Sequence, residues 1–159
     1  LATHLNQDQL TNHIDRKQYI ALRKQSGFWI NMKRVAIRKI KHGLYEADAG
    51  NKHLITFFEP TPALLKEWLT SHNVSFIEST QHPIQIQTYE RGCGLTGSCA
   101  SASVAVSAIM AEKTQQQLQW TVRSPKGTIK THQINGDWWQ QGHAKLIKTL
   151  SVRDIFDQS

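Results

Sequence analysis

The sequence predicts an α+β fold in which antiparallel strands surround one buried helix. One observation is a run of small and apolar residues at 100–112, which is apolar on every side and therefore typical of a buried helix. A second is a series of short β-type runs separated by turn residues. The 159 residues, of which 39% are hydrophobic, suit one domain with a substantial core.

The elements follow in chain order. Residues 1–18 are polar with spaced leucines, which favours a helix or a frayed tail. Strands are predicted at 19–22, 28–32, 35–40, 53–58, 74–77, 84–89, 119–122, 127–134 and 144–149. A second helix is predicted at 63–69, with Thr61 as its cap and Pro62 just inside its start. The strand at 84–89 alternates, with Ile84, Ile86 and Thr88 on one face and Gln85, Gln87 and Tyr89 on the other.

Composition narrows the class of protein. No apolar run approaches the roughly 20 residues of a membrane helix, and the polar start predicts no secretory signal. We therefore expect a cytoplasmic protein that does not bind membranes. The net charge of +7 is densest at 33–42, which we interpret as a strand with solvated cations. No nucleic-acid motif accompanies it, so nucleic acid is not an expected partner. No Cys/His spacing predicts a metal site.

Cys99 is the candidate catalytic residue. It stands immediately before the predicted buried helix and follows a loop with glycines at 92, 94 and 97. The first turn of a helix carries unpaired N–H groups and the positive end of the dipole, which favour a thiolate. The same N–H groups can hold a carboxylate. Glu90 and Arg91 lie just before the loop and add two charged side chains.

This segment resembles the second cysteine motif of the diaminopimelate epimerase family. The matching residues are Glu90, Arg91, Gly92, Gly94, Thr96 and Cys99. The sequence departs from the family at Ala100, Ser101 and Ala102, where the family has Gly-Thr-Gly. Three further segments resemble the family in the same order, at 48–55, 73–76 and 142–144. The resemblance covers about the last two-thirds of the chain.

The resemblance implies a half-barrel of strands wrapped around a central helix. It also implies an isomerase that needs no cofactor and interconverts LL- and meso-diaminopimelate, on the path to lysine and peptidoglycan. The implied catalytic residues are Cys99, Glu90 and His53. The implied substrate-binding residues are Asn51, Asn73, Glu90, Arg91, Ala100 and Ser101.

The family's other cysteine motif, with an Asn-Gly-x-Arg context, is not found in this sequence. The other cysteine, Cys93, falls at a variable position of the motif described above. We therefore expect residues 1–42 to be a remnant of the first half or an N-terminal extension, and 43–159 to be the second half. Such a truncated or split form is expected to be inactive by itself, and to act as a homodimer or with a separately encoded first half.

Two alternatives stay open at this point. The departures at Ala100 and Ser101 lie where the resemblance places the substrate carboxylate, so the substrate could be another amino acid, such as histidine or proline. The chain could instead be a non-catalytic binding or interaction domain on the same fold.

Overall fold

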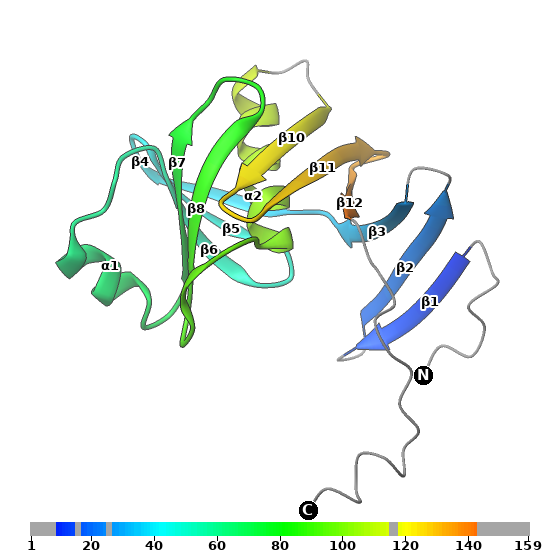
Figure 1. The fold of residues 1–159 in the computed structure, drawn as a ribbon, viewed down its shortest axis with the longest axis horizontal. Helices are drawn as coiled ribbons and strands as arrows, with labels where there is room; N and C mark the ends of the chain where they lie inside the picture. Colours follow the sequence, from blue (N-terminus) through cyan, green and yellow to red (C-terminus); the bar gives the residue numbers. More distant parts are fainter. Residues whose placement is uncertain (1–8, 15–16, 25–26, 115–117, 143–159) are drawn as a thin grey trace, which may run out of the picture.

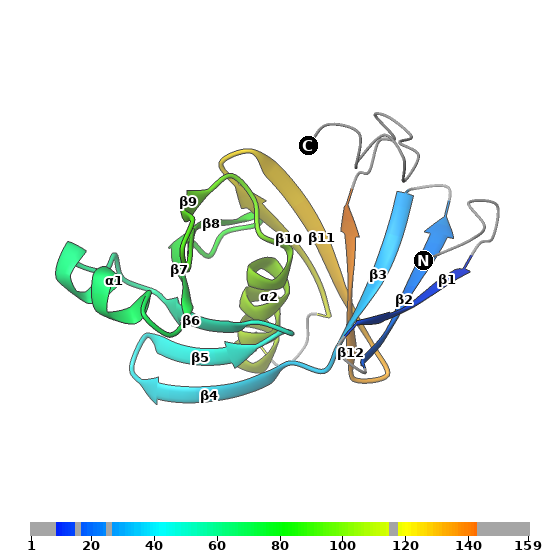
Figure 2. The same ribbon diagram turned by 90° about the horizontal axis from the view of Figure 1, so that it is seen from below.

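A twelve-stranded sheet curls around helix α2 in the computed structural model, which describes residues 9–14, 17–24, 27–114 and 118–142 (Figures 1 and 2). The first six strands are β1 (Gln9–Ile14), β2 (Lys17–Lys24), β3 (Gly27–Lys33), β4 (Ala36–Lys41), β5 (Leu44–Asp48) and β6 (Lys52–Thr56). The others are β7 (Asn73–Ser79), β8 (Ile84–Glu90), β9 (Gly94–Thr96), β10 (Gln119–Ser124), β11 (Gly127–Ile134) and β12 (Asp137–Gly142). The helices are α1 (Pro62–Trp68) and α2 (Ala100–Thr114).

The sheet is open and mixed. Its strand order is β1-β2-β3-β12-β11-β10-β8-β7-β6-β5-β4, and β9 pairs with β8 off this path. The pairs β10–β8 and β6–β7 are parallel, and the remaining neighbours are antiparallel. Figure 2 shows β1, β2 and β3 leading away from the strands that enclose α2. The predicted α+β half-barrel around a central helix is thus confirmed, with a correction: the sheet is not antiparallel throughout.

Helix α2 is buried from Ser101 to Met110. Small residues allow this, because the strands can approach the helix from several sides. Its serines satisfy their hydroxyls locally: Ser103 Oγ donates to the carbonyl of Cys99 at 3.0 Å, and Ser107 Oγ to that of Ser103 at 2.8 Å. Thr131 in β11 donates to Ser107 Oγ at 2.7 Å, which ties the helix to the sheet. The N-terminus of α2 is therefore held at a fixed place in the half-barrel.

Several predicted elements are confirmed and others are wrong. Helix α1 begins at Pro62, and Thr61 accepts from the Leu64 N–H at 3.4 Å, as a cap should. The helix or tail expected at 1–18 is wrong over 9–14, which form the edge strand β1, and over 17–18, which begin β2. Strands β5, β9 and β12 were not predicted; the structure places them next to partners on the sheet. The predicted strand at 144–149 lies outside the described residues.

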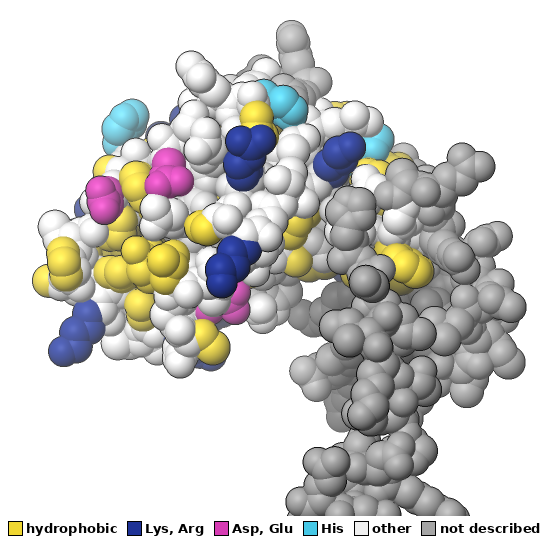
Figure 3. All heavy atoms as spheres, in the orientation of Figure 1, with side chains coloured by type: hydrophobic (Ala, Val, Ile, Leu, Met, Phe, Trp, Pro, Cys, Tyr) yellow, Lys and Arg dark blue, Asp and Glu magenta, His cyan; other side chains and the backbone are white. Residues whose placement is uncertain are grey.

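Charged side chains are distributed rather than gathered. In Figure 3 the Lys and Arg side chains of the described residues lie apart from one another on the face shown. Strand β4 carries the densest basic stretch and is exposed at every position except Ile37. In β4 Arg38 is paired with Glu46 of β5, as expected for a solvated edge strand.

Among the described ranges, no helix combines the length and apolarity that crossing a membrane requires.

Candidate active site

Cys99 immediately precedes the first residue of α2 and lines a cavity of about 370 Å³. The cavity is lined by Met32, Ala49, Gly50, Asn51, Glu90, Ser98, Cys99, Ala100 and Ser101. The glycine loop before the helix contains β9, which folds back on β8. Gly92 and Gly94 allow this turn because their φ angles, 82° and 78°, lie in the left-handed region. The fold therefore brings Cys99, Glu90, Asn51, Ala100 and Ser101, all predicted site residues, to one cavity.

The thiol of Cys99 is buried, with 7% of the residue exposed. Burial raises the pKa of the Cys99 thiol. Hydrogen bonds from the Ser101 hydroxyl and the Ala102 backbone act in the opposite direction, and the Glu90 carboxylate raises the pKa by its charge and by a hydrogen bond with the thiol. The expectation of a ready thiolate is therefore wrong for the chain as it stands: burial outweighs the helix terminus, and Arg91 is exposed to solvent.

His53 in β6 is fully buried, and its Nε2 lies 3.0 Å from Ser101 Oγ. Ser101 Oγ in turn lies 3.5 Å from Cys99 Sγ. Burial lowers the pKa of His53 to about 4, against smaller opposing effects from Glu90 and Asp48. The imidazole is therefore neutral near pH 7. These contacts place His53 behind Ser101, on the protein side of the cavity that Cys99 lines.

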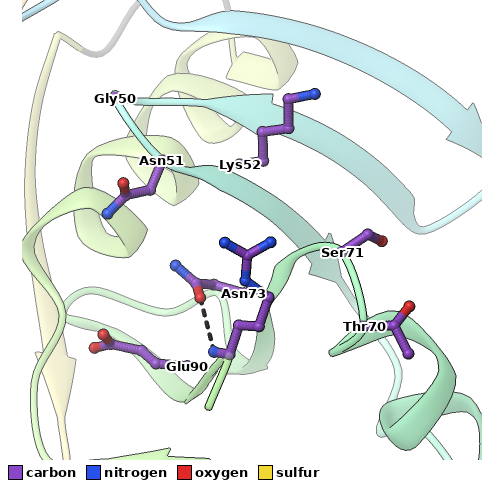
Figure 4. A pocket seen from close by; sticks show the side chains of 8 residues that line it. Gly50, Asn51, Lys52, Thr70, Ser71, Asn73 and Glu90 are labelled. Carbon is purple, nitrogen blue, oxygen red and sulfur yellow. Dashed lines mark hydrogen bonds between the residues drawn. The ribbon is translucent and has the colours of Figure 1, made fainter. Parts of the chain in front are cut away.

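A second, larger cavity of about 670 Å³ adjoins the first and shares Gly50, Asn51 and Glu90 with it. It is completed by Lys52, Thr70, Ser71, Asn73 and Arg91. Figure 4 shows Asn51, Asn73 and Glu90 reaching toward it from one side, with Thr70 and Ser71 on the other. The two cavities together form a polar groove. Cys99 lies in the smaller cavity, and the charged residues Lys52 and Arg91 line the larger one.

Two hydrogen bonds fix polar residues of this groove. Asn73 Oδ1 accepts from the Arg91 backbone N–H at 2.9 Å, drawn as the dashed line in Figure 4. Thr96 Oγ1 lies 3.1 Å from Glu90 Oε1. The amide of Asn73 thus bridges the start of β7 and the end of β8. Glu90 and Arg91, which are adjacent in sequence, both line the second cavity.

Sequence reasoning missed Lys52, Thr70 and Ser71 as lining residues. Lys52 lies within the segment 48–55 but was not singled out there, and Thr70 and Ser71 follow α1, far from any motif. Cys93 is exposed in the turn between β8 and β9, apart from the lining of both cavities. In the ranges that the structure describes, no cluster of His, Cys, Asp or Glu could hold a metal ion. The roles of the site residues stay predictions.

Solved structures of other proteins share this fold. A phenazine biosynthesis protein of the PhzF family from Enterococcus faecalis superposes with a TM-score of 0.68 at 12% identity, covering 91% of this chain and 65% of that one. A predicted epimerase from Pseudomonas aeruginosa gives 0.64 at 14%, covering 89% and 67%. A probable proline racemase from Agrobacterium radiobacter gives 0.62 at 10%, covering 98% and 64%. At these identities the likeness establishes the fold alone.

Sequence comparison is more specific. The chain is 30% identical to diaminopimelate epimerase of Rickettsia canadensis over 110 residues, which cover 63% of this chain and 41% of that protein. It is 28% identical to diaminopimelate epimerase of Lactiplantibacillus plantarum over 127 residues, covering 64% and 38%. No family model matches the sequence. The chain is thus related to diaminopimelate epimerases, as its cysteine motif indicated, and spans about two-fifths of the length of these relatives.

Proposed function

We propose that the chain supplies one half of the active site of a cofactor-independent amino-acid epimerase, with LL- and meso-diaminopimelate as substrates. The observation that carries the proposal is Cys99, placed at the N-terminus of α2 on a cavity that it shares with Glu90. The relatives named above as epimerases support the reaction class.

The proposed chemistry is proton transfer at the α-carbon. Glu90 takes the proton of the Cys99 thiol, and the resulting thiolate removes the α-proton of the substrate. The developing carbanion is stabilised if the substrate carboxylate is held by the backbone N–H groups at Ala100 and Ser101, which belong to the first turn of α2. The residues that hold the carboxylate and the residue that moves the proton are then adjacent in sequence.

Inversion of configuration needs a second acid on the opposite face of the carbon. Cys93 does not line either cavity. We therefore propose that the second acid comes from a second copy of the chain or from a separately encoded first half. The division of the chain near residue 42, into a first-half remnant and a second half, remains part of this proposal.

The second cavity favours diaminopimelate over a short amino acid. Arg91, Lys52 and Asn73 line it, and it adjoins the cavity of Cys99. A substrate with a second amino-acid group can pair a distal carboxylate with these cations, and a distal ammonium with Glu90. A racemase of proline would leave the second cavity without a ligand group. A non-catalytic binding domain would use the same groove without Cys99.

We expect meso-diaminopimelate to bind the Cys93→Ser protein more tightly than L-lysine, which lacks the distal carboxylate, or L-proline. Arg91→Ala should weaken diaminopimelate binding about tenfold, the size of one charge-assisted hydrogen bond. Lys39→Ala, which removes an exposed cation of β4, is the matched control and should have no effect. Isothermal titration calorimetry measures the affinity of each ligand and of each variant. Equal affinity for proline and diaminopimelate would contradict the substrate, and no binding at millimolar concentration would contradict the site.

A further inference from the structure

We propose that His53 and Ser101 are positioning residues that direct a chain of hydrogen bonds onto the sulfur of Cys99. In this chain the Nε2–H of His53 donates to Ser101 Oγ, and the Ser101 hydroxyl donates to Cys99 Sγ. The inference rests on the proposed acid–base role of Cys99. Its test measures the reactivity of the Cys99 thiol and needs no substrate. The hydrogen-bond proposal and the proposed function can therefore fail separately.

The geometry comes from two elements that are distant in sequence. His53 lies on β6 and is fully buried, and Ser101 lies in the first turn of α2, 48 residues further along the chain. The Nε2–Oγ distance is 3.0 Å, and the Oγ–Sγ distance is 3.5 Å. The second distance is ordinary for a sulfur acceptor, because sulfur is larger than oxygen. Ser101 therefore stands between the imidazole and the thiol.

The direction of donation follows from the other ring nitrogen of His53. Nδ1 is buried and has no hydrogen-bond partner among the described residues. A neutral imidazole carries one N–H, and a buried donor without a partner is costly. Placing that hydrogen on Nε2 gives it Ser101 Oγ as acceptor. The single hydrogen of the Ser101 hydroxyl is then free to point to the sulfur of Cys99.

Charged groups act on both ends of this hydrogen-bond chain, on His53 and on Cys99. Glu90 and Asp48 act on His53 as negative charges, and His72 acts on it in the opposite sense. Glu90 also acts on Cys99, where it raises the pKa of the thiol, whereas Ser101 and the Ala102 N–H lower it. When the thiol proton passes to the Glu90 carboxylate, these two donors remain on the sulfur. The products of that step are a neutral carboxylic acid and a thiolate, while His53 and Ser101 keep their protons.

The test measures how the rate of Cys99 alkylation by iodoacetamide depends on pH, in the Cys93→Ser protein. Ser101→Ala should raise the midpoint of this profile by about one pH unit, because it removes a donor to the thiolate. Ser101→Thr keeps the hydroxyl and should retain the parent midpoint. Ser103→Ala is the matched control: it removes a buried hydroxyl that bonds the carbonyl of Cys99, not its sulfur. Equal midpoints for Ser101→Ala and Ser103→Ala would overturn the proposal.

A second measurement needs no further substitution and stays decisive if Ser101→Ala folds poorly. Nitrogen-15 NMR of the histidine rings in the Cys93→Ser protein reports which nitrogen of His53 is protonated. We expect the Nε2–H form at pH 7. The Nδ1–H form would overturn the proposal, because Ser101 would then have to donate to His53 and could not donate to Cys99.

Discussion

His53→Gln is expected to remove much of the chain's loss of stability in mild acid. Burial lowers the pKa of His53 from 6.5 to about 4. Between these two pH values the unfolded chain is protonated at His53 and the folded chain is not. The resulting stability is complete above pH 6.5 and is lost as the pH falls toward 4. At about 1.4 kcal/mol per pH unit, the full loss is roughly 3 kcal/mol. Glutamine has no such titration.

The measurement is the free energy of unfolding in urea at pH 7.5 and pH 4.5. Glu46, whose pKa is lowered by hydrogen bonds from His72 and Arg38, also makes the chain acid-sensitive, but it does so in every variant. The comparison with the parent protein therefore isolates His53. His42→Gln, at an exposed turn, is the control and should keep the parent difference. An unchanged difference in His53→Gln would show that His53 is not buried as a neutral ring.

Ile109→Ala is expected to destabilise the chain by about 2–5 kcal/mol, because it leaves a cavity in a packed core. Ile109 is fully buried in the middle of α2, with Val104, Ala105 and Val106. Leu95→Ala is a suitable control, since Leu95 is 55% exposed and should change stability by less than about 0.5 kcal/mol. Urea unfolding of both variants at pH 7.5 gives the comparison. A small effect at Ile109 would contradict a half-barrel organised around α2.

The central helix could be predicted from sequence because its composition leaves no polar face. Strand β8 could be predicted because its buried residues alternate: Ile84, Ile86 and Thr88 face the core. Strand β12 pairs with β11 and with the distant β3, and β1 lies at the sheet edge against β2; the residues of both strands are polar or mixed. Such strands depend on tertiary context, which local pattern does not contain.

The site shows a similar division. Cys99, Glu90 and Asn51 could be placed together because they lie in motifs whose order matches one family. The contact between His53 and Ser101 joins residues 48 positions apart and could not be read from spacing. The protonation state of Cys99 was mispredicted because the helix terminus is visible in sequence, whereas burial is not. Thr70 and Ser71 enter the groove through the packing of α1 beside β7, and Lys52 enters it at the start of β6.

The most direct test of the account is hydrogen exchange at the α-carbon of meso-diaminopimelate in D₂O, followed by NMR and chiral chromatography. Cys93→Ser is compared with the double variant Cys93→Ser/Cys99→Ala. With one acid on one face, Cys99 can remove the α-proton and return a deuteron to the same face. We expect slow deuterium entry that is lost in the double variant. Inversion should accompany this entry only if a second copy of the chain supplies the opposing acid. Equal exchange without Cys99, or no exchange at saturating substrate, would contradict the account.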